Sequence, residues 1–485
     1  MGEILVAVRK PETIGPESGL GLAPRRAGAR IAAACLVAGA GLFAVIGAAG
    51  AQTLDEALVS AYLNNPTLLA QRAQLRATDE QVPQALSGFR PTITADGSAG
   101  KSRNSSESSF FGAKENRSPR SLSLNLKQPV FRGLRSFAQT RQAENNVRAG
   151  RAQLAGIEQQ ILLAAATSFM DVVRDQAVLE LNVGNEQVLR RQLQAARDRF
   201  EVGEVTRTDV SQAEARVARA VADRVQAEGN LKISRSGYRN VVGSTPGKLE
   251  APAGAVQVPA TLEETIETAR TGNPSVISAQ YTEKASHDSI DLVAGELLPT
   301  ITLNGDLSRN LSTSSRGSRG SNASIIAQLS VPLYQAGSVT SRIRAAKQVA
   351  AQRRMQIAVA RRAAVDSANS AWETLAAAKA RIRAFEAEVR ANTIALDGVT
   401  QEAAAGLRTV LDVLDAEQEL LDARVNLVRA QRDEVVASLQ LRSSVGWLSA
   451  EKLDLEVERY DVEAHYNKVK NKLWGLGDPV APAEK

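Results

Sequence analysis

Cysteine and histidine are scarce in this sequence, and their scarcity excludes several kinds of site. The one cysteine, Cys35, cannot form an intrachain disulfide or a thiolate metal cluster. The two histidines, His287 and His465, are isolated in the sequence, and no set of His, Asp and Glu has metal-ligand spacing. We therefore expect no metal site and no cofactor.

Aromatic residues make up only 4% of the chain, and the formal net charge is +6 over 485 residues. Surfaces that bind nucleic acid combine clustered basic residues with aromatic side chains. The most basic helical stretch, residues 342–362, contains no aromatic residue. We interpret it as a solvated helix face and expect no nucleic-acid partner.

Motifs of catalysis are also missing. GSTPGK (243–248) is one residue shorter than a phosphate-binding loop and lacks the following Ser or Thr, so we interpret it as a linker. Asp412 and Asp415 could resemble an acid–base pair, but the sequence indicates no nucleophile or substrate pocket beside them. The chain is predicted not to be an enzyme.

Residues 1–51 have the pattern of a secretory signal peptide. Arg25, Arg26 and Arg30 precede the apolar stretch IAAACLVAGAGLFAVIGAAGAQ, and cleavage is predicted after Ala51. A retained membrane anchor is the alternative, since the stretch is near the lower length limit for a membrane span.

The rest of the chain contains an internal repeat. TLDEALVSAYLNNP (53–66) returns as TLEETIETARTGNP (261–274), and PTIT returns as well. Farther on, Gly203, Asp209 and Gly243 match Gly406, Asp412 and Gly446. The separation of the matches shortens across a Ser- and Asn-rich loop, so the two halves differ mainly in that loop. We expect one architecture used twice.

Each half is predicted to contain two helices, a strand, a polar loop, a second strand, a very long helix, a turn and a last helix. Apolar residues in the segment from about 138 to 200 recur on one helical face, and no proline interrupts it. Its expected partners, about 66–88 and 209–241, together reach nearly the same length. This pattern predicts an extended coiled-coil wall.

The strands are predicted from alternation and from proline. SLSLNLKQPV (121–130) alternates leucine with polar residues, and AQLSVPL (327–333) alternates in the same way. A proline adjoins each expected strand, where a locked φ suits a change from helix to strand. Four strands cannot close a barrel, so strands that cross a membrane require several chains: three chains would give twelve strands and two would give eight.

These features together resemble the TolC-like outer-membrane efflux and export proteins, over essentially the whole mature chain. The resemblance depends on the duplicated start with N-P, the junctions QPVFRG and VPLYQAG, RFEVGEVTRTDVSQAEA and EAAAGLRTVLDVLDAEQELLDA. The C-terminal RYDVEAHYNKVKNKLWGLGDP resembles the ending of α-proteobacterial members.

The resemblance implies a mainly α fold with a small β part. A homotrimer would share a twelve-stranded barrel in the outer membrane and continue into the periplasm as a long α-helical tunnel. The expected segments are the signal peptide, a first repeat (52–250; strands about 91–100 and 120–130), a second repeat (251–450; strands about 299–308 and 322–333) and a periplasmic extension (451–485).

The implied function is the exit duct of a tripartite efflux or type I secretion system. Its partners would be a periplasmic adaptor protein, an inner-membrane RND or ABC transporter, and outer-membrane lipid. The alternative is a periplasmic coiled-coil scaffold or adaptor without a pore, which would leave the strands unexplained. Drug efflux and protein or polysaccharide export both stay open, because the inner-membrane partner chooses the cargo.

Carboxylates on the last long helix are the candidate pore site. Asp412 and Asp415 lie about 60° apart on a helical wheel and begin a stripe that continues through Glu419 and Asp422. In a threefold tube they would form stacked acidic rings, which favour cations. Among the first-half positions that match this stripe, only Asp209 is acidic, which suggests that the second hairpin lines the pore. A solvated coiled-coil flank is the alternative interpretation.

The resemblance also assigns a gate. Arg408 matches the family's gate arginine, and Asp209 matches the carboxylate that restrains the neighbouring helix pair; an exposed link of this kind contributes about 0.2–1 kcal/mol. The family's gate tyrosine is replaced here by Ala403. Gly203 and Gly406 are expected at the tight turns of the tunnel tip, which the resemblance makes the adaptor-docking surface.

Overall fold

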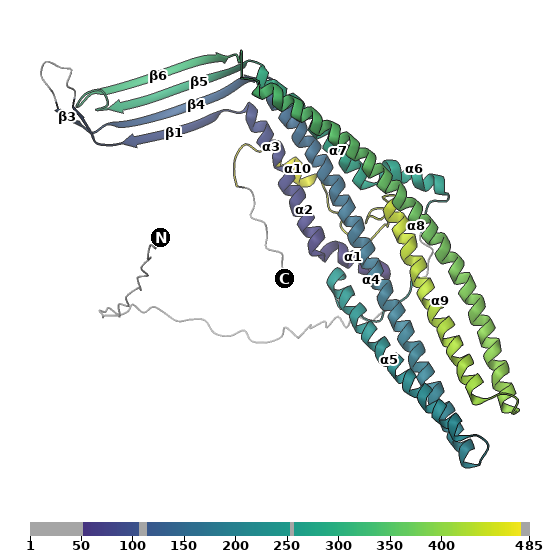
Figure 1. Cartoon of the computed structure of the whole chain (residues 1–485). Coiled ribbons are helices and arrows are strands. Elements are labelled where there is room, and N and C mark those ends of the chain that lie inside the picture. Colours follow the sequence, from purple (N-terminus) through teal and green to yellow (C-terminus); the bar gives the residue numbers. More distant parts are fainter. Residues whose placement is uncertain (1–51, 106–113, 253–256, 477–485) are drawn as a thin grey trace, which may run out of the picture. The chain divides into compact units, whose positions relative to one another are not determined.

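A computed structural model describes residues 52–105, 114–252 and 257–476. The predicted signal peptide, its cleavage after Ala51, and Cys35 lie outside the described residues, as does the end of the predicted C-terminal extension. Everything that follows concerns the described ranges, which are mainly helical with a small part in strands (Figure 1).

The first half contains three short helices, the first strands and the first long hairpin. The short two-stranded sheet formed by Ser102–Ser105 and Lys114–Arg117 was not predicted; it lies within the polar loop between the strands Thr92–Ala99 and Arg120–Arg132. The elements are α1 (Leu54–Asn64), α2 (Pro66–Asp79), α3 (Gln81–Leu86), β1 (Thr92–Ala99), β2 (Ser102–Ser105), β3 (Lys114–Arg117), β4 (Arg120–Arg132), α4 (Arg135–Glu201) and α5 (Arg207–Val242).

The second half has the same order of main elements, followed by a C-terminal segment. It comprises α6 (Leu262–Gly272), α7 (Pro274–Ala294), β5 (Thr300–Leu311), β6 (Arg319–Ser330), α8 (Ser338–Ala404), α9 (Val410–Ser444) and the short α10 (Ala464–Val469). Single turns of 3-10 helix, at Ser87–Phe89 and Gly295–Leu297, precede β1 and β5.

The two N-P dipeptides have the same structural role in each half. Asn65 caps α2 and Asn273 caps α7, and in both helices the proline occupies the first turn. The Asn65 Nδ2 also donates to Val241 O at 2.9 Å, and the Asn273 Nδ2 donates to Ser444 O at 2.9 Å. Each asparagine therefore fastens the start of its helix to the end of the long hairpin in its own half of the chain.

Long helices pack side by side in two antiparallel pairs, α4 with α5 and α8 with α9, as Figure 1 shows. The pairs meet where α4 contacts α9, and α7 packs against both α4 and α8. The largest core lies where α1 and α2 cover the middle of α4 and the end of α5, around the fully buried Phe169 and Tyr238. Within the described residues, no helix combines the length and the apolar content needed to cross a bilayer.

Four antiparallel strands form one sheet in the order β1-β4-β5-β6 (Figure 1). The strand predictions are close, but β6 ends at Ser330, so Val331 and Leu333 are wrongly included in the predicted strand. The predicted helix 66–88 is also wrong as one element, because α2 ends at Asp79 and α3 begins anew before Pro83. In both places a proline, which cannot donate a backbone hydrogen bond, limits the regular element.

The C-terminal segment returns to the first half of the chain. Tyr466 packs beside Val82 and Ala85 of α3, and Arg151 pairs with Glu463 at 2.7 Å. His465, which is isolated in the sequence, is not isolated in space, since its Nδ1 lies 3.1 Å from the buried carboxylate of Asp79.

Candidate functional site

The turn between the helices of each long pair is built around a glycine. Gly203 has φ of +82° and Gly406 has φ of +75°, a conformation that side chains with a Cβ rarely adopt. The amide that follows each glycine closes the turn: Glu204 N donates to Arg199 O, and Leu407 N donates to Glu402 O, both at 2.9 Å. No neighbouring atom lies within 4 Å of where a Cβ would be, so the backbone conformation alone requires glycine.

A capping box follows each turn. Thr206 caps α5 and Thr409 caps α9, and in each box the third helical residue, Asp209 or Asp412, returns its carboxylate to the cap. Asp412 Oδ2 accepts from Thr409 N at 2.9 Å and from Thr409 Oγ1 at 2.8 Å. These bonds, together with the charge of Arg408, hold the pKa of the Asp412 carboxyl below its usual range.

Sequence reasoning missed this role of Asp209 and Asp412. The signal was present as Thr-x-x-Asp at the start of each helix, a variant of the capping-box pattern. The box explains why both halves carry an aspartate at this position. It does not explain Asp415, whose first-half counterpart is Gln212.

Asp415 pairs with Arg216, which comes from α5 of the other helix pair. The two residues lie beside a cluster in which Leu414 is buried among Leu189, Ala196 and other apolar residues of α4 and α5. Packing around Leu414 therefore brings its neighbour Asp415 to α5. Sequence reasoning did not identify Arg216 as the partner of Asp415.

The remaining predicted site residues are exposed or, in the case of Asp209, partly exposed. Arg408 Nε donates to Glu402 Oε2 at 2.9 Å, and both side chains are about half exposed. In the described part of one chain, Arg408 and Asp209 do not bind each other: Arg408 binds Glu402, and Asp209 accepts from Thr206. Glu419 and Asp422 lie exposed farther along α9, where Asp422 accepts from Gln418 at 3.0 Å.

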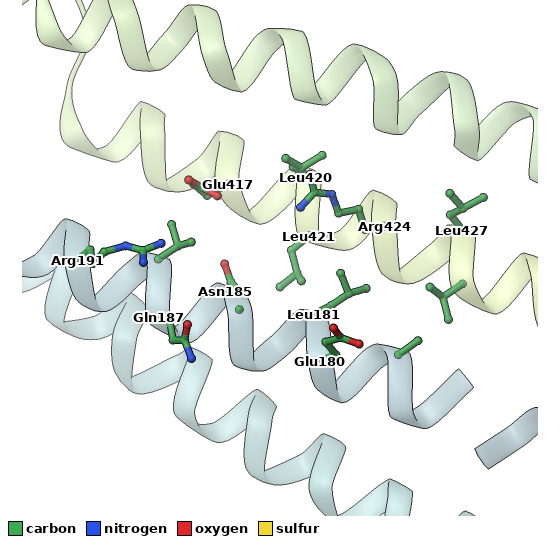
Figure 2. Close-up of a pocket in the computed structure, with 14 residues that line it drawn as sticks. Glu180, Leu181, Asn185, Gln187, Arg191, Glu417, Leu420, Leu421, Arg424 and Leu427 are labelled. Carbon is green, nitrogen blue, oxygen red and sulfur yellow. The ribbon is translucent and has the colours of Figure 1, made fainter. Parts of the chain in front are cut away.

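A groove of 560 Å³ runs between α4 and α9, and Figure 2 shows its charged residues on both helices. Glu417 of α9 is the half-buried acid here: burial raises its pKa, and the nearby Arg424 and Arg191 partly oppose that rise. At 100° per residue, Glu417 and Arg424 lie on the side of α9 opposite Asp412 and Asp415. The acidic stripe and the groove thus occupy opposite faces of the helical wall.

The sheet also has two different faces. In one row, Ile93 pairs with Leu126, Leu126 with Gly305, and Gly305 with Ile325. The opposite face is polar and hydrogen-bonded, for example from Asn125 Nδ2 to Asp96 Oδ2 at 2.9 Å. On the first, apolar face, the apolar residues and glycines are Ile93, Ala95, Gly97, Leu122, Leu124, Leu126, Ile301, Leu303, Gly305, Leu307, Ala323, Ile325, Ala327 and Leu329. The same face carries Gln128 near the helices and Arg120, Arg309, Arg319 and Ser321 toward its other end.

GSTPGK follows the end of α5 as an irregular connection with no helix directly after it, which agrees with its interpretation as a linker. Within the described ranges, no group of three or more His, Cys, Asp or Glu side chains is arranged to hold a metal ion.

Comparison with known proteins agrees with this architecture. The family model described as "Outer membrane efflux protein" matches residues 57–244 and 265–447. The outer membrane efflux protein BepC of Brucella suis is 36% identical over 451 residues, which cover 93% of this chain and 97% of BepC. The outer membrane protein TolC of Vibrio cholerae is 30% identical over 423 residues, covering 85% of this chain and 95% of TolC.

Among solved structures, the outer membrane channel CmeC of Campylobacter jejuni superimposes with a TM-score of 0.74 at 14% identity, covering 86% of this chain and 89% of CmeC. At that identity the likeness shows the fold alone.

Proposed function

This chain belongs to the outer membrane efflux protein family, and from that membership we propose that three copies assemble into one continuous duct through the outer membrane and periplasm. The family and its relatives place the protein in the outer membrane as an efflux or secretion channel.

The observation that carries the proposal is the sheet with one apolar and one polar face. An apolar face suits lipid, and a polar face suits a water-filled interior. The outer edges, β1 and β6, would leave backbone groups unpaired in a bilayer, where each unpaired group costs several kcal/mol. Pairing β1 of one copy with β6 of the next satisfies these groups, and three copies give a barrel of twelve strands.

The same observation argues against a scaffold or adaptor without a pore. In water, the apolar face of the sheet would remain exposed over four strands, with Ile325 79% accessible in one chain. An exposed face of this kind with two open edges promotes aggregation.

In the proposed duct, the acidic face of α9 lines the lumen near the hairpin tip. Asp412 and Asp415 of three copies form two acidic rings at the constriction, with Glu419 and Asp422 above them. The depressed pKa of Asp412 keeps its ring charged at neutral pH, and charged rings favour cations. The groove of Figure 2, on the opposite face of α9, then lies outside the lumen.

The gate is proposed to act between neighbouring copies. Arg408 is exposed at the tip, where it pairs with Glu402 of its own turn, so it can exchange this partner for Asp209 of an adjacent hairpin. Such an exposed link is weak, about 0.2–1 kcal/mol, which suits a gate that must open. The tip turns at Gly203 and Gly406 are the proposed docking surface for a periplasmic adaptor, which would connect the duct to an RND or ABC transporter.

The direct test is the single-channel current of the purified protein in a planar bilayer. The unmodified protein should show a small cation-selective conductance, and Asp412→Ala combined with Asp415→Ala should reduce the selectivity. Glu180→Ala is the matched control, because it removes an exposed carboxylate in the groove on the other face of the wall. Absence of current from correctly inserted protein would overturn the channel; unchanged selectivity in the double variant would overturn the constriction alone.

A further inference from the structure

The last described residues form a short segment with exposed apolar and basic side chains. Leu473, Trp474 and Leu476 are strongly exposed, with Trp474 89% accessible to solvent. Lysines stand just before them at 468, 470 and 472. Tryptophan is enriched at the surface of lipid bilayers, and lysines attract anionic lipid headgroups.

The position of this segment is fixed by contacts with the first half of the chain. Helix α10 lies against α2, as Figure 1 shows, and Tyr466 packs on the cluster formed by α3 and α4. Farther on, Arg90 Nη1 donates to Lys472 O at 2.9 Å. Arg90 stands two residues before the start of β1, so the exposed residues that follow Lys472 leave the helical part at the level where the sheet begins.

Other exposed apolar side chains gather at the same level of the molecule. They occur at the four junctions between helix and strand, where Tyr334 is 88% accessible and the rings of Phe89 and Phe137 contact each other edge to face. Membrane strands are commonly flanked by such aromatic residues at the bilayer surface. The exposed junction residues are Phe89, Val130, Leu134, Phe137, Leu297, Leu298, Val331, Leu333 and Tyr334.

We propose that Leu473, Trp474 and Leu476 insert into the periplasmic surface of the bilayer that contains the sheet, while the preceding lysines bind phospholipid phosphates. The inference depends on the proposed function, because it needs the sheet to lie in the membrane. Its ligand is a phospholipid surface, to which both the apolar side chains and the positive charge are complementary. The segment would fix the depth of the channel from outside the strands.

Quenching of tryptophan fluorescence by lipid tests the proposal. The full-length mature protein is reconstituted into vesicles of phosphatidylethanolamine and phosphatidylglycerol, with and without brominated acyl chains. Two other tryptophans, Trp372 and Trp447, pack against clusters in the helical part and serve as an internal background. Trp474→Ala should remove most of the lipid-quenched emission. Because Trp474 is almost fully exposed in the chain, this change does not disturb the core.

A second variant separates this inference from the proposed function. Ile325→Trp places a reporter on the apolar face of the sheet, and brominated lipid should quench it if the sheet lies in the bilayer. Quenching of that reporter without quenching of Trp474 would overturn the anchor and leave the channel intact. Quenching of Trp474 by aqueous iodide would also overturn the anchor, because it would place the side chain in water. If neither iodide nor brominated lipid quenched Trp474, a neighbouring subunit would cover it, and the anchor would again be overturned. Absence of quenching at residue 325 would overturn the membrane sheet itself.

Discussion

Arg216 of α5 and Asp415 of α9 form an ion pair that joins the two long hairpins close to their tips. The residues are 199 positions apart in the sequence, and each stands on the second helix of its own pair. The Arg216 side chain is 26% exposed and the Asp415 side chain is 51% exposed, so water reaches the pair. A carboxylate predicted to face the pore is thus opposed by a positive charge within its own chain.

Replacing Arg216 by alanine should increase the cation selectivity of the channel. The change removes the positive charge that faces Asp415, so the proposed constriction becomes more negative. The fold should be affected little, because an exposed ion pair contributes about 0.2–1 kcal/mol. Reversal potentials in a planar bilayer under a salt gradient measure the selectivity.

Arg219→Ala is the matched control for this experiment. Arg219 lies one turn farther along α5 and its Nε stands 3.7 Å from Asp223 of the same helix, so its removal leaves Asp415 paired. Equal changes in both variants would show that net charge, and not the contact with Asp415, determines the effect.

Cation selectivity should be lost at acidic pH, where Asp412 becomes protonated, and Thr409→Val should move this loss to higher pH. The pKa of Asp412 is depressed, so the stability that its ionised form contributes is present above the unfolded pKa of about 3.9 and is lost as pH falls through the folded value. Valine removes the hydroxyl that donates to Asp412, which raises the folded pKa towards its ordinary range. The pH dependence of the reversal potential reports the shift.

The equivalent change in the first repeat provides the control. Thr206→Val removes the same hydroxyl from the cap of α5, where Oγ1 donates to Asp209 at 2.8 Å. Both variants lose an N-cap, which costs about 0.5–2 kcal/mol. A pH shift of the same size in both would contradict a specific role of the Asp412 ring.

The long helices and the strands could be predicted because their patterns are local. Residues 138–200 repeat apolar positions at helical spacing, and the leucines from 122 to 126 alternate, so each pattern marks its own element. The end of β6 could not be predicted from alternation, since Val331 and Leu333 continue the pattern beyond Ser330. The backbone decides that boundary, because Pro332 has no amide hydrogen to donate.

The candidate site was less predictable, because it depends on which faces meet in space. A helical wheel places Asp412 and Asp415 on one side of α9 but does not show which helix covers that side. The contact of Asp415 with Arg216 follows from the packing around Leu414. The capping box at Thr409 is local and was predictable from Thr-x-x-Asp, whereas the exposed positions of Glu419 and Asp422 fit a pore lining and a solvated flank equally well.

Gly203→Ala and Gly406→Ala should each destabilise a tip turn by about 1–2 kcal/mol, the cost of a left-handed conformation for a residue with a Cβ. Space is not the reason, since no neighbouring atom lies within 4 Å of the added carbon. Limited proteolysis at the turn measures local opening, and the variants should be cleaved faster. Gly398→Ala, inside α8 and equally uncrowded, should be neutral or slightly stabilising.

Asn65→Ala should destabilise the protein more than an ordinary loss of a helix cap. The Asn65 side chain is buried, caps α2 through Oδ1 and donates from Nδ2 to Val241 O. Its removal loses the cap and leaves an acceptor at the end of α5 unpaired; an unpaired buried group alone costs about 1–3 kcal/mol. We therefore expect a loss of about 2–4 kcal/mol in the free energy of unfolding from both effects together.

Denaturant unfolding of the detergent-solubilised protein measures this loss, with Asn64→Ala as the control. Asn64 is the preceding residue and is exposed, with only a 3.5 Å contact to Ser60, so its replacement should change stability by less than about 0.5 kcal/mol. Asn273→Ala should resemble Asn65→Ala, because Asn273 caps α7 and donates to Ser444 O at the end of α9. If Asn65→Ala were as mild as Asn64→Ala, the fastening of α2 to the first hairpin would not contribute to stability, and the repeated N-P dipeptide would act only as a helix start.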